Sequence, residues 1–231
     1  MAQQYYESAR AQGRIQYDLF VLSELKYHSA QAGRVDDALY YNVYYLRYIL
    51  DYYDEFFPAV PHDVEYLQTF TVSRKEIYQT LDTFQNCYDM MEGDMDAGRC
   101  YELQMEIYYL KGRTLNRDGK REKGLIYAEK LIGLAGRAGD ERMLLYGYIE
   151  APCYGVKAED SALMKRYLCL VKEMKNLSYY QPEYGSILRL ESYCHILDGE
   201  YETAEELLNK SIEIFSRPRL KNTYFYPAAG A

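Results

Sequence analysis

The residues that most often do chemistry in proteins are few and scattered in this chain. His28, His62 and His195 show neither an HExxH pattern nor a paired spacing that would hold zinc. Cys194 and His195 are adjacent, but neighbouring residues on a helix point about 100° apart and share a proton poorly. We therefore expect no metal site and interpret His195 as a packing residue.

Two further patterns fall short of known phosphate and calcium sites. The stretch Gly112…Gly119-Lys-Arg has six residues between its glycines instead of four, has Arg121 in place of the Ser or Thr after the Lys, and follows no predicted strand. Asp94-x-Asp96 lacks the other ligands of a calcium loop. With no acid–base pair in sight, we expect no catalytic residues and no cofactor, and predict that the chain is not an enzyme. The alternative, a helical enzyme with a buried site, would need a deep pocket with a perturbed acid, base or thiol.

The composition indicates which partners are unfavourable and in which cellular compartment the protein is expected. The 231 residues carry 27 Lys+Arg against 35 Asp+Glu, a net charge of −8, which disfavours direct nucleic-acid binding. The basic stretch within 111–123 is interpreted as a solvated helix end and loop, with a patch for an acidic partner as the alternative. Five cysteines without a CxxC pair indicate a reducing compartment. Neither a signal peptide nor a membrane-spanning run is found, so we expect a cytoplasmic protein.

A repeating layout organises the chain. A turn residue is followed five places later by a small one at Gly33/Ala38, Gly119/Gly124, Lys157/Ala162 and Gly199/Ala204, while Tyr78 takes the small-residue place after Ser73. The five starts (33, 73, 119, 157, 199) are 40, 46, 38 and 42 residues apart, a period that fits a helix and its return. Small residues at one site of each pair let two helices approach closely.

Helical spacing of apolar residues also marks the segments between these starts. It predicts helices at 15–31, 97–118, 140–155 and 182–197, with a shorter segment at 62–71 and an interruption at Pro152. Together these segments form five helix pairs, at 14–57, 62–92, 97–139, 140–177 and 180–216. We expect them to build one domain over residues 1–231, in which 217–231 is a linker followed by the opening of a further helix.

One segment is unusually rich in tyrosine, which supplies 29 of the residues in a chain without Trp. From Ala38 to Tyr53, apolar and aromatic residues form two opposite helical faces: Leu39, Val43, Leu46 and Leu50 on one, and Tyr41, Tyr45, Tyr48 and Tyr52 on the other. A helix that is apolar on two faces is usually sandwiched between neighbours. The alternative is an exposed aromatic ladder that receives a partner helix or peptide.

Two units carry a resemblance to a known family. The residues concerned are Gly112, Gly119, Leu125, Ala128, Ala135 and Gly139-Asp140 in one, and Gly199, Tyr201, Ala204, Leu207 and Leu208 in the other. On these residues the sequence resembles the tetratricopeptide repeat family, in the longer form of about 40 residues found in bacterial regulators and signalling proteins. The family's usual Trp is absent. The resemblance implies an all-α, right-handed superhelical solenoid of about five antiparallel helix pairs.

The resemblance also implies a binding groove, lined by the first helix of each pair. The residues at its positions are Phe20, Ser23, Tyr27 and Ala30 in the first pair, Glu106, Tyr109, Arg113 and Asn116 in the third, Leu144, Gly147 and Tyr154 in the fourth, and Ser186, Arg189 and Tyr193 in the fifth. Of these, Tyr27, Tyr109, Arg113, Asn116, Tyr154, Arg189 and Tyr193 are the candidate peptide-binding residues. For Arg113 and Asn116, together with Arg117, the alternative is an ordinary polar surface.

These positions shape the expected function. The family's chaperone adaptors bind a terminal carboxylate with Lys and Asn, but Ser23, Tyr109, Gly147 and Arg189 stand at the comparable places, which disfavours chaperone tails. We expect a scaffold that binds a protein or peptide in a bacterial signalling or transcription-control protein, with no contact to nucleic acid or membrane. A structural oligomerisation module is the alternative. Because a helical stack needs a polar end cap, we also expect a homodimer or attachment to a further domain.

Overall fold

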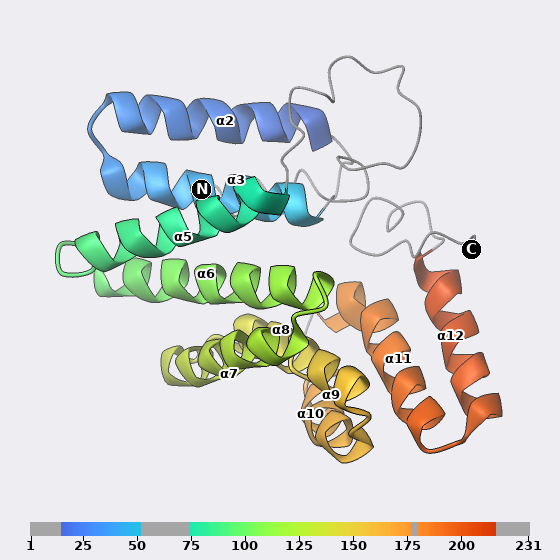
Figure 1. Cartoon of the computed structure of the whole chain (residues 1–231). Helices are drawn as coiled ribbons and strands as arrows, with labels where there is room; N and C mark the ends of the chain where they lie inside the picture. Colours follow the sequence, from blue (N-terminus) through green and yellow to red (C-terminus); the bar gives the residue numbers. More distant parts are fainter. Residues whose placement is uncertain (1–14, 52–73, 177–179, 216–231) are drawn as a thin grey trace. The chain divides into compact units, whose positions relative to one another are not determined.

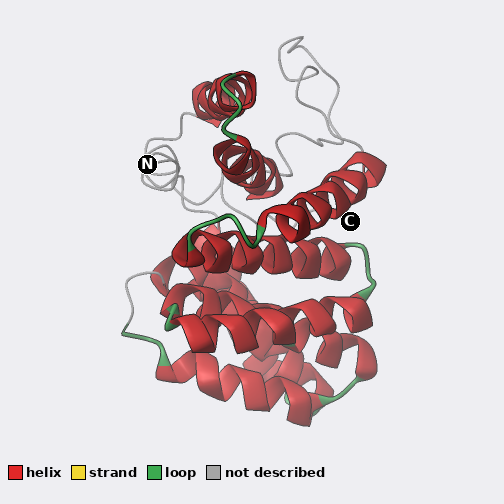
Figure 2. Cartoon of the chain, turned by 90° about the vertical axis from the view of Figure 1, so that its left-hand side faces the viewer, coloured by secondary structure: helices red, strands yellow, loops and turns green. Residues whose placement is uncertain are grey.

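Figure 1 shows a computed structural model of the chain, which describes residues 15–51, 74–176 and 180–215. These residues form helices joined by short loops and contain no strand (Figure 2). The helices are α2 (Ile15–Gln31), α3 (Val35–Asp51), α5 (Arg74–Met91), α6 (Ala97–Arg117), α7 (Arg121–Ala138), α8 (Glu141–Glu150), α9 (Pro152–Ala158), α10 (Ser161–Glu173), α11 (Tyr180–Leu197) and α12 (Tyr201–Phe215). Except for α8 and α9, which follow one another directly, helices adjacent in sequence pack antiparallel, so the expected all-α class is confirmed for this part of the chain.

The predicted helices at 15–31, 97–118 and 182–197 correspond to α2, α6 and α11. The one predicted at 140–155 is split into α8 and α9, because Pro152 begins a new helix directly after Ala151. The predicted segment at 62–71 and the tail at 217–231 lie outside the described residues. No helix within the described ranges is long and apolar enough to cross a membrane.

The described helices belong to two compact units, each with its own buried residues. One contains α2, α3, α5 and α6 up to Gln104, and the other runs from Met105 in α6 to the end of α12. Side chains exposed by 1% or less in the first unit include Leu22, Tyr44, Ile49, Leu81 and Phe84. The main cluster of the second unit includes Leu145, Met164, Leu168, Val171 and Ile187.

Helix α3 is buried on both of its apolar faces. Its predicted aliphatic face, Leu39, Val43, Leu46 and Leu50, is at most 6% exposed. On the opposite face Tyr48 is fully buried and Tyr41 and Tyr45 are partly buried, while Tyr52 lies outside the described residues. The hydroxyls of Tyr40 and Tyr44 donate to Glu102 at the start of α6, at 3.1 and 2.8 Å. The sandwiched interpretation of this helix is therefore confirmed, and α3 carries no exposed aromatic ladder.

Three predicted turn glycines share one backbone geometry. Gly33, Gly119 and Gly199 have φ values of 70°, 72° and 78°, in the left-handed region that glycine adopts without steric cost. The N–H of each glycine bonds the carbonyl three residues back, and the next N–H bonds the carbonyl five residues before itself, at 2.9 Å each. This pair of bonds is the Schellman motif, which ends a helix and starts the return.

The fourth such turn is made without glycine. Glu159 has φ 53°, and the N–H of Asp160 bonds the carbonyl of Gly155 at 2.9 Å, as in the other turns. The predicted start at Lys157 is therefore wrong by two residues. In the last three of these turns the left-handed residue stands at 119, 159 and 199, which makes both intervals 40 residues (159 − 119 and 199 − 159); Gly139, at the end of α7, is left-handed as well.

The shifted turn also changes which residue packs at the helix crossing. Ala162, the predicted small residue, is exposed, and the position five after the turn residue is held by Met164, which is fully buried. Gly155 on α9 makes room for it, since a Cβ there would lie 2.4 Å from Met164 Cγ. The prediction of Ala162 at the contact is thus wrong, because the small residue sits on the opposite helix.

The predicted close crossing is present between α6 and α7. A Cβ on Gly124 would lie 3.2 Å from the carbonyl oxygen of Gly112 and 2.0 Å from Asn116 Oδ1. On α12, Ala204 is 2% exposed at the equivalent place. Small residues at these sites therefore permit the approach that their spacing predicted.

Candidate binding surface

The four turns give each preceding helix a common register. Counted back from Gly119, positions 13, 10, 6 and 3 are Glu106, Tyr109, Arg113 and Asn116, the predicted groove side of α6. Their exposed fractions are 1%, 3%, 1% and 9%. The predicted groove residues of α6 therefore lie together on one helical face, and that face is buried.

The aromatic and guanidinium groups of this face contact one another. The Tyr109 ring stacks on that of Tyr146 on α8, with centroids 5.0 Å apart and ring planes at 25°. Arg113 Nη1 donates to the Tyr109 hydroxyl at 3.1 Å. Arg113 is thus anchored within the second unit, and the alternative of an ordinary polar surface is wrong for it.

A buried carboxylate lies one turn before Tyr109. Glu106 Oε1 is 3.7 Å from Arg142 Nη2, and only 17% of the Arg142 side chain is exposed. Because a lone buried carboxylate is costly to desolvate, a facing guanidinium offsets part of that cost. This ion pair links α6 to the first turns of α8.

Asn116 links α6 to the other end of α8. Its Nδ2 donates to the Glu150 carbonyl at 3.1 Å and to Glu150 Oε2 at 2.7 Å. The helix breaks here, and the N–H of Tyr154 bonds the carbonyl of Ala151 in a tighter i−3 turn. Asn116 therefore satisfies the Glu150 carbonyl at the break, and the surface interpretation of this residue is also wrong.

The register of the fourth pair differs from the prediction. Counted back from Glu159, the same four positions are Tyr146, Ile149, Cys153 and Val156, not Leu144, Gly147 and Tyr154. Gly147 faces α7, because a Cβ on it would lie 2.6 Å from Ile132 Cγ1. Gly147 is thus excluded from the groove side. Tyr154 is partly buried beside Cys153, and its binding role stays a prediction.

Cys153 occupies the place that Arg113 holds in α6. The pKa of its thiol is raised to about 12, mainly by burial and then by the nearby Glu150 carboxylate, while Arg189 and Arg121 act in the opposite direction. A thiol with such a pKa stays protonated at neutral pH and is a poor nucleophile. We therefore interpret Cys153 as a packing residue with a weakly hydrogen-bonding thiol, and not as a nucleophile.

The groove positions of α11 are more open than those of α6. Ser186 is 5% exposed and Arg189 is partly buried, whereas Tyr193 is 37% exposed. In the first unit, Phe20 and Tyr27 on α2 are 46% and 57% exposed. The candidate residues thus divide into a buried set on α6 and exposed aromatic side chains on α2 and α11.

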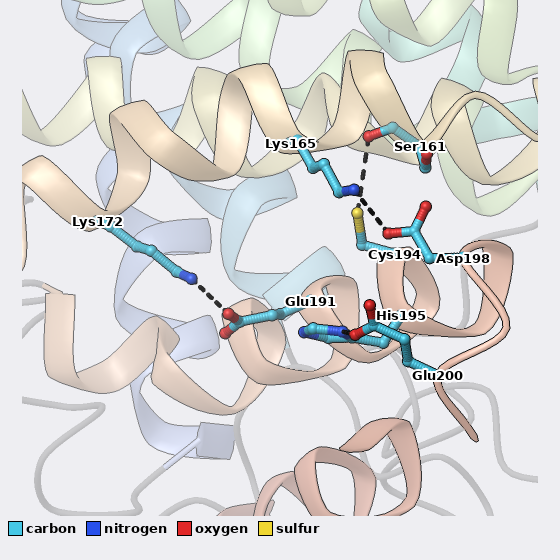
Figure 3. Close-up of polar contacts among 8 residues, drawn as sticks. All are labelled: Ser161, Lys165, Lys172, Glu191, Cys194, His195, Asp198 and Glu200. Atoms are coloured by element: carbon cyan, nitrogen blue, oxygen red, sulfur yellow. Dashed lines mark hydrogen bonds and ion pairs between the residues drawn. The ribbon is translucent and has the colours of Figure 1, made fainter. Parts of the chain in front are cut away.

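The adjacent Cys194 and His195 contact different partners, as their helical positions predicted (Figure 3). Cys194 is 3% exposed, its Sγ donates to the Ser161 carbonyl at 3.6 Å, and burial raises the pKa of its thiol. His195 Nδ1 lies 2.6 Å from Glu200 Oε2. The two side chains therefore do not form a nucleophile–base couple.

Two ion pairs join α10 to α11 and the residue that follows α11 (Figure 3). Lys165 Nζ lies 2.7 Å from Asp198 Oδ2, and Lys172 pairs with Glu191. Hydrogen bonds from Lys165 and then Ser161 lower the pKa of the Asp198 carboxyl. Exposed ion pairs of this kind contribute little to the free energy of unfolding, so we assign them no large part in holding α10 and α11 together.

The remaining candidate for ion binding has a structural role. Asp96 Oδ1 accepts hydrogen bonds from the N–H groups of Gly98 and Arg99, at 2.9 and 3.2 Å. It caps the first turn of α6 in this way. Across the described residues, no group of three or more His, Cys, Asp or Glu side chains is placed to hold a metal ion.

Comparison with known proteins adds no assignment. No protein-family model, curated protein or solved structure matches the chain.

Proposed function

We propose that the chain is a non-catalytic scaffold that binds a peptide or protein segment through the first helices of its helix pairs. In this proposal the pairs form a right-handed superhelical solenoid of the tetratricopeptide type, and the chain serves as the sensory or regulatory module of a bacterial signalling or transcription-control protein. The 40-residue interval between equivalent turns supports the repeat, because equal hairpins stack most simply in a row.

One observation carries the binding role. Tyr27 and Tyr193 occupy the same register position, six residues before Gly33 and Gly199, and both are exposed, by 57% and 37%. Tyrosine supplies a large, rigid contact area with few rotatable bonds and a hydroxyl that adds direction. Each unit thus has an exposed aromatic side chain at the same register position of a first helix, where it can serve as an anchor for a peptide.

Polar contacts also hold α6 and α8 together within the second unit, which contains Tyr193. The ion pair of Glu106 with Arg142 and the bonds of Asn116 to Glu150 fix α8 against α6. A fixed face loses less entropy when a ligand binds, so more of the contact energy appears as affinity.

A selection of displayed peptides against the full chain tests the proposal. Tyr193→Ala should weaken a selected peptide by about tenfold, because an anchor side chain contributes at least about 1.4 kcal/mol. The matched control is Tyr184→Ala on the same helix, which removes an equally exposed (37%) tyrosine outside the four register positions. Equal losses in both variants, or no selected peptide at all, would contradict the proposal.

A further inference from the structure

Helix α12 exposes an apolar stripe beside the face that packs on α11. Tyr201 and Ile212 are 66% and 51% exposed, and Leu208 between them is partly buried. Spacings of seven and four residues place the three side chains on one helical face. Ala204 and Ser211 lie on a different face, buried to 2% and 3%, and Ser211 Oγ donates to the Gly185 carbonyl of α11 at 2.8 Å.

Carboxylates border this α12 stripe. Glu202 and Glu206 are exposed on its flank, and Glu205 lies within it. Lys210 is the single basic residue of the helix, so α12 carries four carboxylates against one ammonium group. An apolar stripe with an acidic flank is complementary to an amphipathic helix with a basic flank.

We propose that the α12 stripe docks a helix of a partner protein, whose apolar face is flanked by Lys and Arg. The 15 residues of α12 span about 22 Å, room for three turns of such a helix. A second copy of α12 is disfavoured, because Glu205 and its neighbours would then face their own carboxylates. The surface uses neither Tyr193 nor Arg189, so it is independent of the function proposed above.

Fluorescence anisotropy with the full chain and a synthetic peptide tests the docking surface. The probe is a helical peptide of about 18 residues with Leu on one face and Lys on the flanks, long enough to form a helix in isolation. Its control has Glu in place of Lys. The basic peptide should bind and the acidic one should not.

Variants with matched controls locate the binding. Ile212→Ser should weaken the basic peptide by about tenfold, whereas Ile126→Ser on α7, where the side chain is 50% exposed against 51%, should change it less than about twofold. If circular dichroism shows that Ile212→Ser unfolds the chain, Tyr201→Ser at the more exposed end of the stripe replaces it.

The charge contribution needs a control of equal net charge. Glu205→Lys/Glu206→Lys should weaken the basic peptide by more than about tenfold, and Asp94→Lys/Glu173→Lys, which reverses two exposed acids elsewhere, should change it by less than about twofold. Equal losses in the two double variants would mean diffuse attraction to the net charge of −8 and would overturn the proposal.

Two further outcomes would also overturn it. If light scattering shows a dimer that Ile212→Ser dissociates, the occupant of the stripe is a second copy of this chain. If Tyr193→Ala weakens the basic peptide as much as Ile212→Ser does, the peptide binds the groove side of α11. Retained binding by Tyr193→Ala supports the α12 surface, whatever the outcome for the proposed function.

Discussion

Asn116 and Gly124 are coupled across the crossing of α6 and α7. The carboxamide of Asn116 points at Gly124 while its Nδ2 bonds Glu150, so the glycine provides the space that the amide occupies. A Cβ at Gly124 would meet Asn116 Oδ1 at 2.0 Å, far inside normal contact. The hydrogen bond at the end of α8 thus depends on a missing methyl group on α7.

We expect Gly124→Ala to lower the free energy of unfolding by about 1–3 kcal/mol, because the methyl displaces the amide in a packed crossing. Asn116→Ala alone should cost about 1–2 kcal/mol through its lost hydrogen bonds. In the Asn116→Ala background the clash is gone, and the higher helix propensity of Ala should make Gly124→Ala nearly neutral. Urea unfolding of the four proteins measures this cycle, and additive effects would contradict the coupling.

The burial of Arg113 was not predictable from its place in the sequence. Helical spacing puts Arg113 on one face with Tyr109 and Asn116, and a charged residue on such a face is usually solvated. Its partner Tyr109, however, stacks on Tyr146, a contact between residues far apart in the sequence. Spacing therefore predicts which side chains share a face, but it does not predict what covers them.

At the scale of the elements, the turn between α9 and α10 explains why the fourth groove face was misassigned. Glycine marks the left-handed residue at Gly119 and Gly199, so those registers could be predicted from the sequence. Glu159 adopts φ 53° although it is not a glycine, so the sequence does not reveal this turn. The register inferred from Lys157 therefore began two residues before the actual one. Because a helical face repeats every 3–4 residues, two residues suffice to exchange a groove position for a packing one.

The left-handed conformation costs a residue with a Cβ about 1 kcal/mol. Glu159→Gly should therefore raise the free energy of unfolding by about 0.5–1 kcal/mol. Gly199→Glu places a glutamate at the left-handed position of the next equivalent turn and should lower the free energy of unfolding by about 1 kcal/mol. Thermal or urea unfolding followed by circular dichroism measures both, and a destabilised Glu159→Gly would show that the glutamate side chain contributes more than its backbone costs.

At the scale of the whole molecule, the abundance of tyrosine links stability to alkaline pH. The pKa values of Tyr40, Tyr45, Tyr167 and Tyr180 are raised, in each case chiefly because burial disfavours the charged tyrosinate. The folded protein then holds these protons more tightly than the unfolded chain does. Their effect on stability is absent below the ordinary pKa of 10.0 and destabilising as the pH rises above it.

Alkaline titration should therefore unfold the protein cooperatively above about pH 10. Helical circular dichroism should be lost together with the appearance of tyrosinate absorbance. Tyr180→Phe keeps the ring, removes one ionising hydroxyl and should move the midpoint to higher pH. A lower midpoint, at unchanged stability near neutral pH, would contradict the assignment of Tyr180.

Much of the helical layout could be predicted because its signals are local. Gly33, Gly119 and Gly199 mark turns, and the ends of α2, α6 and α11 lie close to their predicted places. The division at Gln104 within α6 has no such signal, because no Gly or Pro stands between residues 99 and 111 of the helix. Where one compact unit ends depends on contacts between distant residues, which no local pattern encodes.

The equal turns at 119, 159 and 199 have a consequence for how this chain tolerates rearrangement. Segments 120–159 and 160–199 each begin just after the left-handed residue of one of these turns and end on that of the next, and Gly139, left-handed as well, lies inside the first segment. Their joints therefore share a left-handed residue and the hydrogen bond from the following N–H to the carbonyl five residues before it. A gene duplication cut at these joints adds a 40-residue cassette whose two ends already fit, so this protein can lengthen by whole hairpins without any turn being rebuilt.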